Sequence, residues 1–441
     1  MLKVLLISTY ELGRQPFGLA SPAAWLRDAG CKVTCVDLAC EFLPREAAAE
    51  ADLIAFYLPM HTATRLAVPV IRRLHAGTPE AHICAYGLYA PMNEGYLRDI
   101  GVQTILGGEF EQGLRDLATR LEQGDRAPQR EAMISLGRQA FVTPDRSGLL
   151  PLHRYAKLLE NGQEKLVGYT EASRGCKHLC RHCPVVPVYN GVFRVVEREI
   201  VLEDIRRQVA AGAQHVTFGD PDFFNGPAHA AAIVQAVHAE HPAITYDVTV
   251  KIEHLRRHRD LLPLLKKTGC LFVTSAVESV DDAVLEKLAK GHTRADFIEV
   301  VRIMRHTGLT LAPTFVTFTP WTTWQGYREL LRLLVELDLV ENVSPIQLAI
   351  RLLIPAGSRL LDLEDIRSIA GPFDRAALSY PWRHADPSLD ELCRDLQALI
   401  RRKGSRAELF GRIWERAYGG PPDFHLASRA TVPYLNEPWY C

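Results

Sequence analysis

The chain has 441 residues, of which 47% are hydrophobic and 23% are charged, and its formal net charge is −1. This composition is typical of a globular protein with two or three domains. No basic stripe indicates nucleic-acid binding, and no apolar run reaches the ~20 residues needed to span a bilayer. We therefore expect a cytoplasmic protein without nucleic-acid or membrane partners, whose ten cysteines stay reduced.

Residues 1–125 predict a first α/β domain. Strand-like apolar runs such as LKVLLIS, DLIAFYL and HICAYG alternate with helix-like stretches such as TRLAVPVIRRLHAG. Nearly continuous apolar strands that alternate with helices indicate a parallel sheet covered by helices on both faces. The polar stretch GDRAPQREAMISLGRQ follows, and we expect residues 126–150 to be a linker.

A second series of about six strand–helix units begins near residue 151 and ends with SPIQLAIRLLIP. Right-handed crossovers would close such units into a full or partial barrel. The predicted fold class is therefore α/β, with a doubly wound, Rossmann-like domain followed by a partial (βα)6 barrel over residues 151–365. Residues 366–441 mix helix and loop and predict no fold of their own.

The stretch CKHLCRHC, residues 176–183, places Cys176, Cys180 and Cys183 in one short loop. Three thiolates at this spacing can converge on one inorganic centre, and a cubane held by three cysteines leaves one iron open for a ligand. A zinc site with His178 or His182 as the fourth ligand is an alternative, as are structural or redox thiols. No second cysteine pair of the kind used by structural zinc occurs elsewhere, which favours the cubane.

The CX3CX2C motif at the front of a βα-repeat region resembles radical S-adenosylmethionine (SAM) enzymes, and the resemblance covers roughly residues 150–360. It implies a [4Fe–4S] cluster whose open iron is chelated by the amino and carboxylate groups of SAM. It also implies reductive cleavage of a C–S bond, usually giving a 5′-deoxyadenosyl radical. A small-molecule substrate and an electron donor of the flavodoxin or ferredoxin type would be the partners.

The same resemblance implies SAM-binding positions near the first two strands. In TFGDPDFFNG, the motif that holds the amino group of SAM through backbone carbonyls falls on Gly219, Asp220 and Pro221. An aromatic residue that packs on adenine often precedes the third cysteine of the family motif. Here that position is His182, whose imidazole can also stack.

Further candidates lie on the later strands. Ser275 and Glu278 occupy positions where the family contacts the ribose and the carboxylate of SAM, although Glu278 could simply cap the following helix. Lys251 lies at the end of the third strand and is either a cofactor contact or a surface charge. Arg351 lies within an apolar stretch, and because a buried guanidinium needs an anionic partner, the SAM carboxylate would serve.

The first domain resembles the cobalamin-binding module that often precedes radical SAM barrels, in YLPMHTATRLAVPVIRRL and ILGGEFEQGLRDL. The module's Asp-x-His-x-x-Gly loop, whose histidine binds cobalt, is absent, and residues 10–17 take its place. The resemblance makes His61, Arg65, Gly108 and Glu109 candidate cobalamin contacts, although Gly108 could equally end a strand. It leaves open whether cobalamin is bound.

The chain ends in TVPYLNEPWYC, which resembles the CUAEP/CCAEP-tail subgroup of radical SAM (seleno)proteins. That resemblance implies a natural chain that continues past Cys441 with selenocysteine, and the codon after Cys441 would decide this. A thiol and a selenol are soft nucleophiles that suit a thiophilic substrate such as arsenic(III). Enzymes of arsinothricin synthesis are similar in this respect, which implies transfer of a 3-amino-3-carboxypropyl group. Alternatively, Cys441 has no role.

Three functions compete on this basis. The first is a radical SAM transferase that forms a carbon–heteroatom bond on a soft, thiol-bound substrate, and the tail favours it. The second is a cobalamin-dependent radical SAM methyltransferase of a natural product, which the first domain favours. The third, a non-catalytic metal-binding or sensor protein, is disfavoured because the resemblance extends over several strands and cofactor contacts.

Overall fold

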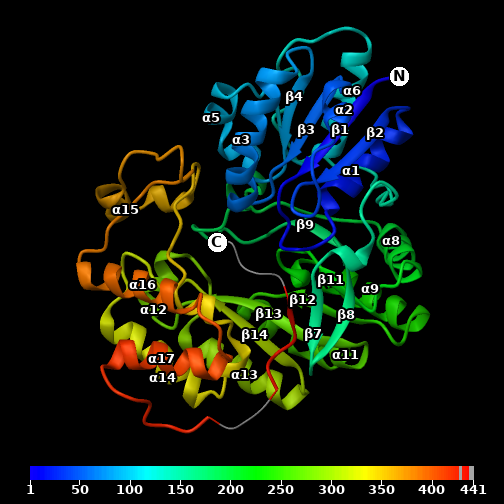
Figure 1. Cartoon of the computed structure of the whole chain (residues 1–441). Helices are drawn as coiled ribbons and strands as arrows, with labels where there is room; N and C mark the ends of the chain where they lie inside the picture. The colour runs from blue at the N-terminus through cyan, green and yellow to red at the C-terminus, as the bar shows by residue number, and fades with distance from the viewer. Residues whose placement is uncertain (427–429, 437–441) are drawn as a thin grey trace.

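The computed structural model describes residues 1–426 and 430–436. An N-terminal α/β part lies above a second α/β part, and a mainly helical C-terminal extension packs beside the latter (Figure 1). The predicted α/β fold class is confirmed by this arrangement. Among the described residues, no helix combines the length and the apolar character needed to cross a membrane.

The first sheet has the strand order β2-β1-β3-β4-β5-β6, and all of its neighbouring strands pair in parallel. Its strands are β1 (Lys3–Ser8), β2 (Lys32–Asp37), β3 (Leu53–Tyr57), β4 (His82–Tyr86), β5 (Thr104–Gly108) and β6 (Ile134–Ser135). Its helices are α1 (Phe17–Asp28), α2 (Arg45–Ala49), α3 (His61–Gly77), α4 (Tyr89–Met92), α5 (Glu94–Asp99) and α6 (Phe110–Glu122). Alternate residues of β1 enter two separate hydrophobic cores, so the sheet is covered on both faces as expected.

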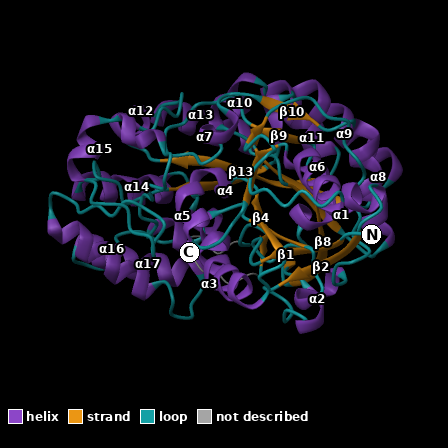
Figure 2. Cartoon of the chain, turned by 90° about the horizontal axis from the view of Figure 1, so that it is seen from above, coloured by secondary structure: helices purple, strands orange, loops and turns teal. Residues whose placement is uncertain are grey.

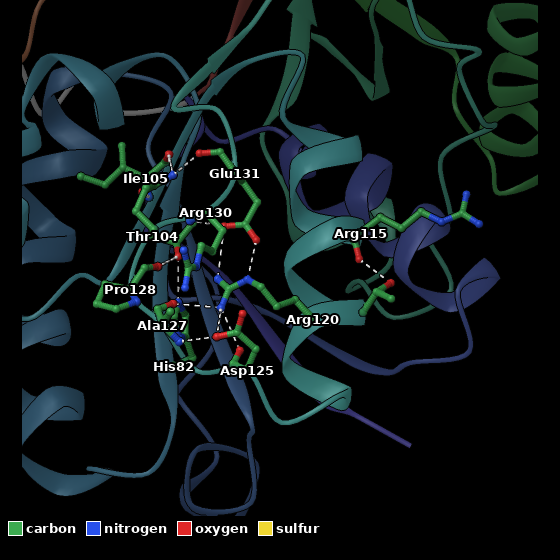
Figure 3. Close-up of polar contacts among 12 residues, drawn as sticks. His82, Thr104, Ile105, Arg115, Arg120, Asp125, Ala127, Pro128, Arg130 and Glu131 are labelled. Carbon is green, nitrogen blue, oxygen red and sulfur yellow. Dashed lines mark hydrogen bonds and ion pairs between the residues drawn. The ribbon is translucent and has the colours of Figure 1, made fainter.

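The segment that we expected to be only a linker supplies β6, at the edge of the first sheet. Arg120 on α6 holds this segment, because its guanidinium pairs with Glu131 at 2.9 Å and donates to the carbonyls of Asp125 and Ala127 (Figure 3). The hydroxyl of Thr104 donates to the carbonyl of Pro128 on the other side. A two-residue strand carries no periodic signal, so the polar composition concealed it.

The second sheet has the order β14-β13-β12-β11-β8-β7-β15 and curves into a partial barrel (Figure 2). Its strands are β7 (Lys157–Glu160), β8 (Gln163–Thr170), β11 (His215–Phe218), β12 (Thr245–Thr249), β13 (Cys270–Glu278), β14 (Thr310–Phe315) and β15 (Tyr434–Leu435). β8 and β11 to β14 run parallel, whereas β7 is antiparallel to both β8 and β15. The helices around it are α8 (Arg198–Ala210), α9 (Pro227–Glu240), α10 (Ile252–Arg257), α11 (Leu262–Lys267), α12 (Asp282–Lys287), α13 (Arg294–Thr307) and α14 (Trp324–Glu336).

The expected strand over SPIQLAIRLLIP is wrong within the described chain. Its first half is the 3-10 helix η5 (Pro345–Leu348), and the rest makes only an isolated bridge between Phe318 and Arg351. Short apolar runs do not distinguish strand from buried helix or loop, and Pro345 and Pro355 limit strand pairing at both ends. The extension beyond it forms α15 (Glu364–Ile369), α16 (Pro387–Leu399) and α17 (Arg406–Tyr418).

Candidate functional site

The three cysteines of the CX3CX2C motif lie in the loop between β9 (Ser173–Gly175) and α7 (Val186–Tyr189). Cys176 and Cys180 are buried, Cys183 is partly buried, and all three are free thiols. Burial raises the pKa of Cys183 to about 12, and the neighbouring thiols of Cys180 and Cys176 raise it further because like charges repel. The loop therefore gathers three sulfur ligands that need a cation to become thiolates together.

The loop is fixed by contacts with the barrel as well as by its own hydrogen bond, from the N–H of Cys183 to the carbonyl of Cys180 at 3.2 Å. Arg181 donates its backbone N–H to the carbonyl of Leu288 at 3.0 Å and its guanidinium to the carbonyls of Glu286 and Lys287, at the end of α12. Lys177 donates its N–H to Oδ1 of Asn225 at 3.2 Å, and the same oxygen lies 4.0 Å from Sγ of Cys176. This donor set fits a [4Fe–4S] cluster, because soft thiolates are the ligands of iron–sulfur centres.

A buried charge cluster lies beside the cysteine loop at the end of β13. Oε1 of Glu278 is 3.1 Å from Nε2 of His182 and 3.5 Å from Nζ of Lys290. Burial raises the pKa of Glu278, but the positive charges of Lys290 and His182 outweigh burial and lower this pKa to about 2. Glu278 also has a φ of 68° at a shift in the β13–β14 register, a conformation that side chains adopt only where the surroundings enforce it.

Two polar side chains near this cluster have no hydrogen-bond partner among the described residues. Ser275 is fully buried on β13, and its Oγ is unpaired. His292 is buried with both ring nitrogens unpaired, and burial lowers its pKa to about 4. Because buried polar groups are nearly always paired in native proteins, such orphan atoms indicate a missing polar ligand. Ser275 thus fits the hydroxyl-rich ribose of SAM.

The expected motif on the strand after the cysteine loop is assembled at the end of β11. Asp220 directs its side chain toward that loop, accepting from the hydroxyl of Ser173 at 2.5 Å and from the N–H of Ala172 at 2.9 Å. Gly219 allows close packing, because a Cβ there would lie 1.8 Å from the hydroxyl of Tyr169. Gly219 and Pro221 both line a cavity between the two parts of the chain. The N–H of Gly219 donates to the carbonyl of Thr170 at 2.8 Å, and a ligand in the cavity could reach Gly219 and Pro221.

The two basic candidates behave differently. Lys251 is buried, and its Nζ lies 3.8 Å from Sγ of Cys180 and 3.6 Å from Oε2 of Glu253, so it is not a surface charge. Arg351 instead pairs with Asp390 at 2.6 Å and packs 3.5 Å from the ring centroid of Trp382. The anionic partner that a half-buried guanidinium requires comes from the C-terminal extension, which corrects our assignment of Arg351 to the cofactor carboxylate.

A cavity of about 380 Å³ occupies the interior of the barrel. It lies within the range of small-molecule pockets, roughly 300–1,000 Å³. Residues from three parts of the chain line it: the loop after β1, the inward faces of the barrel strands, and the C-terminal segment 432–435. Tyr434 and Leu435, which form β15, thus close the open edge of the barrel beside β7.

A smaller cavity of about 130 Å³ lies where the carboxyl edge of the first sheet meets the barrel. Arg174 is buried beside it and pairs with Glu111 at 2.7 Å, Glu171 at 2.8 Å and Glu109 at 3.3 Å. Burial raises the pKa of Glu109 and of Glu171 to about 7, although Arg174 opposes this shift. One guanidinium thus serves three carboxylates, which cannot all ionise without cost.

The candidate cobalamin contacts are only partly brought together. Gly108 lines the small cavity and Glu109 adjoins it. His61 instead lies 2.6 Å from the carbonyl of Ala377, and Arg65 is exposed, so the expectation that these two face the same ligand region is corrected. The lining of this cavity comes from the carboxyl edge of the first sheet and from the segments on either side of the cysteine loop, so a ligand bound there would contact both parts of the chain.

Comparison with known proteins places this geometry in a class. The model of the radical SAM superfamily matches residues 170–334, which contain the cysteine loop and strands β11 to β14. The chain therefore carries a radical SAM domain and is an enzyme. Its cofactors are a [4Fe–4S] cluster and SAM. Of the expected SAM positions, His182, Glu278 and Lys251 lie beside the cysteine loop or within it, whereas Arg351 pairs with Asp390.

Similar proteins with known names extend beyond this domain. Hopanoid C-3 methylase of Methylococcus capsulatus is 24% identical over 353 residues, which are 77% of this chain and 68% of that protein. Among solved structures, the cobalamin-dependent SAM radical enzyme OxsB covers 94% of this chain and 71% of its own, with a TM-score of 0.71 and 14% identity. The match to the methyltransferase TsrM of Kitasatospora setae covers 77% of this chain and 74% of TsrM, with a TM-score of 0.60 and 17% identity. At these identities the structural likeness establishes the fold.

Several residues of the site were missed from the sequence. His292 and Arg174 carried no motif, because their significance comes from burial without partners or from partners far along the chain. The position of Arg174 two residues before Cys176 was the only available signal. Cys441 lies outside the described residues, so its expected role stays a prediction.

Proposed function

We propose that this enzyme transfers a carbon group from SAM to a small molecule held in the 380 Å³ barrel cavity. When bound, the cluster supplies the electron that breaks a C–S bond of SAM, and a flavodoxin- or ferredoxin-type protein would supply that electron in turn. Glu278 with Lys290 and Ser275 on β13 would orient SAM beside the cysteine loop. Gly219, at the expected SAM motif after β11, lines this cavity, which supports the proposal.

We further propose that the acceptor is a soft, thiophilic atom, with arsenic(III) as the substrate to test first. The observation that carries this proposal is the course of the C-terminal segment. β15 is antiparallel to β7, which is antiparallel to β8, so β15 runs in the direction of the barrel strands. The chain thus heads from the cavity toward the carboxyl edge of the sheet, where the cysteine loop begins.

Cys441 follows the last described residue, Asn436, by five positions, a reach of up to about 17 Å at roughly 3.4 Å per residue. A thiol within that reach could bring arsenic(III) to the cavity. In the net reaction the lone pair of arsenic(III) forms the new As–C bond to the 3-amino-3-carboxypropyl carbon. Methylthioadenosine leaves with the electron pair of the broken C–S bond, so no net oxidant is consumed.

Mass spectrometry of the SAM fragments after anaerobic reaction with arsenite tests the proposal. We expect methylthioadenosine together with an alkylated arsenic product. Cys441→Ser should abolish the arsenic product, whereas Cys393→Ser, at a buried position in α16, should retain it. An unchanged product yield in Cys441→Ser would contradict the role of the tail, and 5′-deoxyadenosine alone would contradict the group that is transferred.

A second candidate is a cobalamin-dependent radical SAM methyltransferase. It is favoured by the similarity to hopanoid C-3 methylase and to the fold of TsrM. The 130 Å³ cavity at the carboxyl edge of the first sheet, which Gly108 lines, is where this cofactor would be sought. Retention of cobalamin after anaerobic purification, seen in the visible spectrum, together with S-adenosylhomocysteine as product, would favour this second function over the first.

A further inference from the structure

Three side chains next to the cysteine loop point at one another from separate elements. His178 lies between Cys176 and Cys180, Asp222 follows β11, and His254 lies on α10. Nε2 of His178 is 3.4 Å from Oδ2 of Asp222, and Nδ1 of His254 is 2.7 Å from the same oxygen. One ligand atom from each of the three residues lies within 4.8 Å of the others.

The three converging atoms are also unpaired in the hydrogen-bond sense. Nε2 of His178, Oδ2 of Asp222 and Nδ1 of His254 are each buried without a well-oriented partner among the described residues. The carboxylate is fully buried, and its other oxygen, Oδ1, accepts from the N–H of Phe224 at 3.1 Å. Oδ2 of Asp222 faces the two imidazole nitrogens, at 2.7 Å and 3.4 Å, and a cation between the three atoms would bind all of them at once.

We propose that His178, Asp222 and His254 bind a divalent zinc ion, separate from the iron–sulfur cluster. Two imidazoles and a carboxylate at metal–ligand distances of about 2.0–2.2 Å place the ligand atoms roughly 3.3 Å apart in a tetrahedral site. The distances of 3.4 Å and 2.7 Å bracket that value. The set lacks sulfur, and imidazole nitrogen with carboxylate oxygen is a donor set that zinc accepts in a tetrahedral site.

The other ring nitrogen of His178 faces a carboxylate. Oε2 of Glu253 lies 3.7 Å from Nδ1 of His178, and the Glu253 side chain is 39% exposed. Glu253 would therefore orient the imidazole of His178 from behind, and a water molecule would complete the coordination. His178 would thereby be anchored to β11 and α10, which would fix the middle of the loop that carries two cluster cysteines.

The experiment measures zinc in the full-length protein after anaerobic cluster reconstitution, addition of one equivalent of zinc chloride and desalting. We expect about one zinc per chain by mass spectrometry of the metals, with a zinc X-ray absorption spectrum of nitrogen and oxygen ligands near 2.0 Å. His254→Gln and Asp222→Asn should lower the zinc content at least fivefold. His258→Ala should retain it, because His258 neighbours the His254 ring at a centroid distance of 5.6 Å but is not one of the three converging ligands.

The X-ray absorption spectrum of the unchanged protein keeps the test decisive if a variant folds poorly. Sulfur ligands near 2.3 Å would show that zinc occupies the cysteines instead, and this would overturn the proposal. Zinc that washes out of the unchanged protein would overturn it equally. Iron and sulfide contents, measured on the same samples, report the cluster independently, so failure of the zinc site and failure of the proposed SAM chemistry are distinguishable.

Discussion

The buried carboxylates around Arg174 predict an unusual pH dependence of stability, which Glu109→Gln should remove. Glu109 is 1% exposed, and burial raises its pKa from 4.5 to about 7. A carboxyl whose pKa is higher in the folded than in the unfolded state stabilises the fold below pH 4.5. That contribution is lost as the pH rises through 7, because the unfolded chain then releases its proton more easily.

The magnitude follows from the two pKa values. Between pH 5 and pH 8, a single group with pKa values of 4.5 and about 7 loses roughly 2.5 kcal/mol of folding free energy. This is an upper limit, since Glu171 and Glu111 compete for the same Arg174. Glutamine keeps the shape and the acceptor oxygen but does not titrate. Glu109→Gln should therefore match the unchanged protein at pH 5 and exceed its stability at pH 8.

Urea unfolding followed by circular dichroism at pH 5, 6, 7 and 8 checks this expectation on the anaerobic protein. The difference in midpoint between Glu109→Gln and the unchanged chain should grow steadily with pH. Glu46→Gln, at an exposed position of α2, is the matched control and should show no such trend. A difference that is constant from pH 5 to pH 8, or that shrinks, would refute the reasoning about the Arg174 cluster.

Three further predictions concern the radical SAM domain. Alanine at Cys176, Cys180 or Cys183 should remove the brown colour, the bound iron and SAM cleavage. The control variant Cys270→Ala, at a buried thiol of β13, should keep the cluster. Full iron content in any of the first three variants would contradict the ligand assignment. Ser275→Ala should weaken SAM binding, measured by calorimetry, about tenfold, which is roughly the 1.4 kcal/mol of one hydrogen bond. The iron content should not change. An unaltered affinity for SAM would count against the ribose contact. Lys290→Met should destabilise the fold by about 3–5 kcal/mol, because it breaks the buried ion pair with Glu278. Lys287→Met breaks the more exposed ion pair with Asp365 and should cost less than about 1 kcal/mol. Equal losses of stability in thermal unfolding would contradict this difference.

The sequence predicted local structure well where one pattern had one physical solution. The continuous apolar runs of β3 and β4 could be satisfied only by a strand buried on both faces, and both strands are fully buried. The stretch from Pro345 to Pro355 had several solutions, and the prediction of a strand there was wrong. Its apolar residues are buried in any of these conformations, so composition alone could not decide between them.

Contacts between distant residues were beyond the sequence. Arg351 was correctly identified as needing an anion, but nothing in the local pattern indicated Asp390, 39 positions later. His61 meets the carbonyl of Ala377, which is 316 positions away, and so it faces the C-terminal extension rather than a ligand. The cysteine motif succeeded because its ligands are only three and four positions apart. The ion pairs of Arg174 could not be predicted, because they form where the two parts of the chain meet.

The contacts of Glu109 suggest what the first part of the chain does for the second. Arg174, which reaches Glu109 at 3.3 Å, precedes the cysteine loop in β9, and Tyr189, whose hydroxyl donates to Glu109 at 3.3 Å, follows that loop in α7. One carboxylate at the start of α6 thus holds both ends of the segment that carries the cluster ligands. These contacts lie beside the 130 Å³ cavity at the carboxyl edge of the first sheet, which is where an open sheet of this kind binds a ligand. We infer that this part of the chain braces the cysteine loop against the barrel, so the geometry of the cluster depends on it.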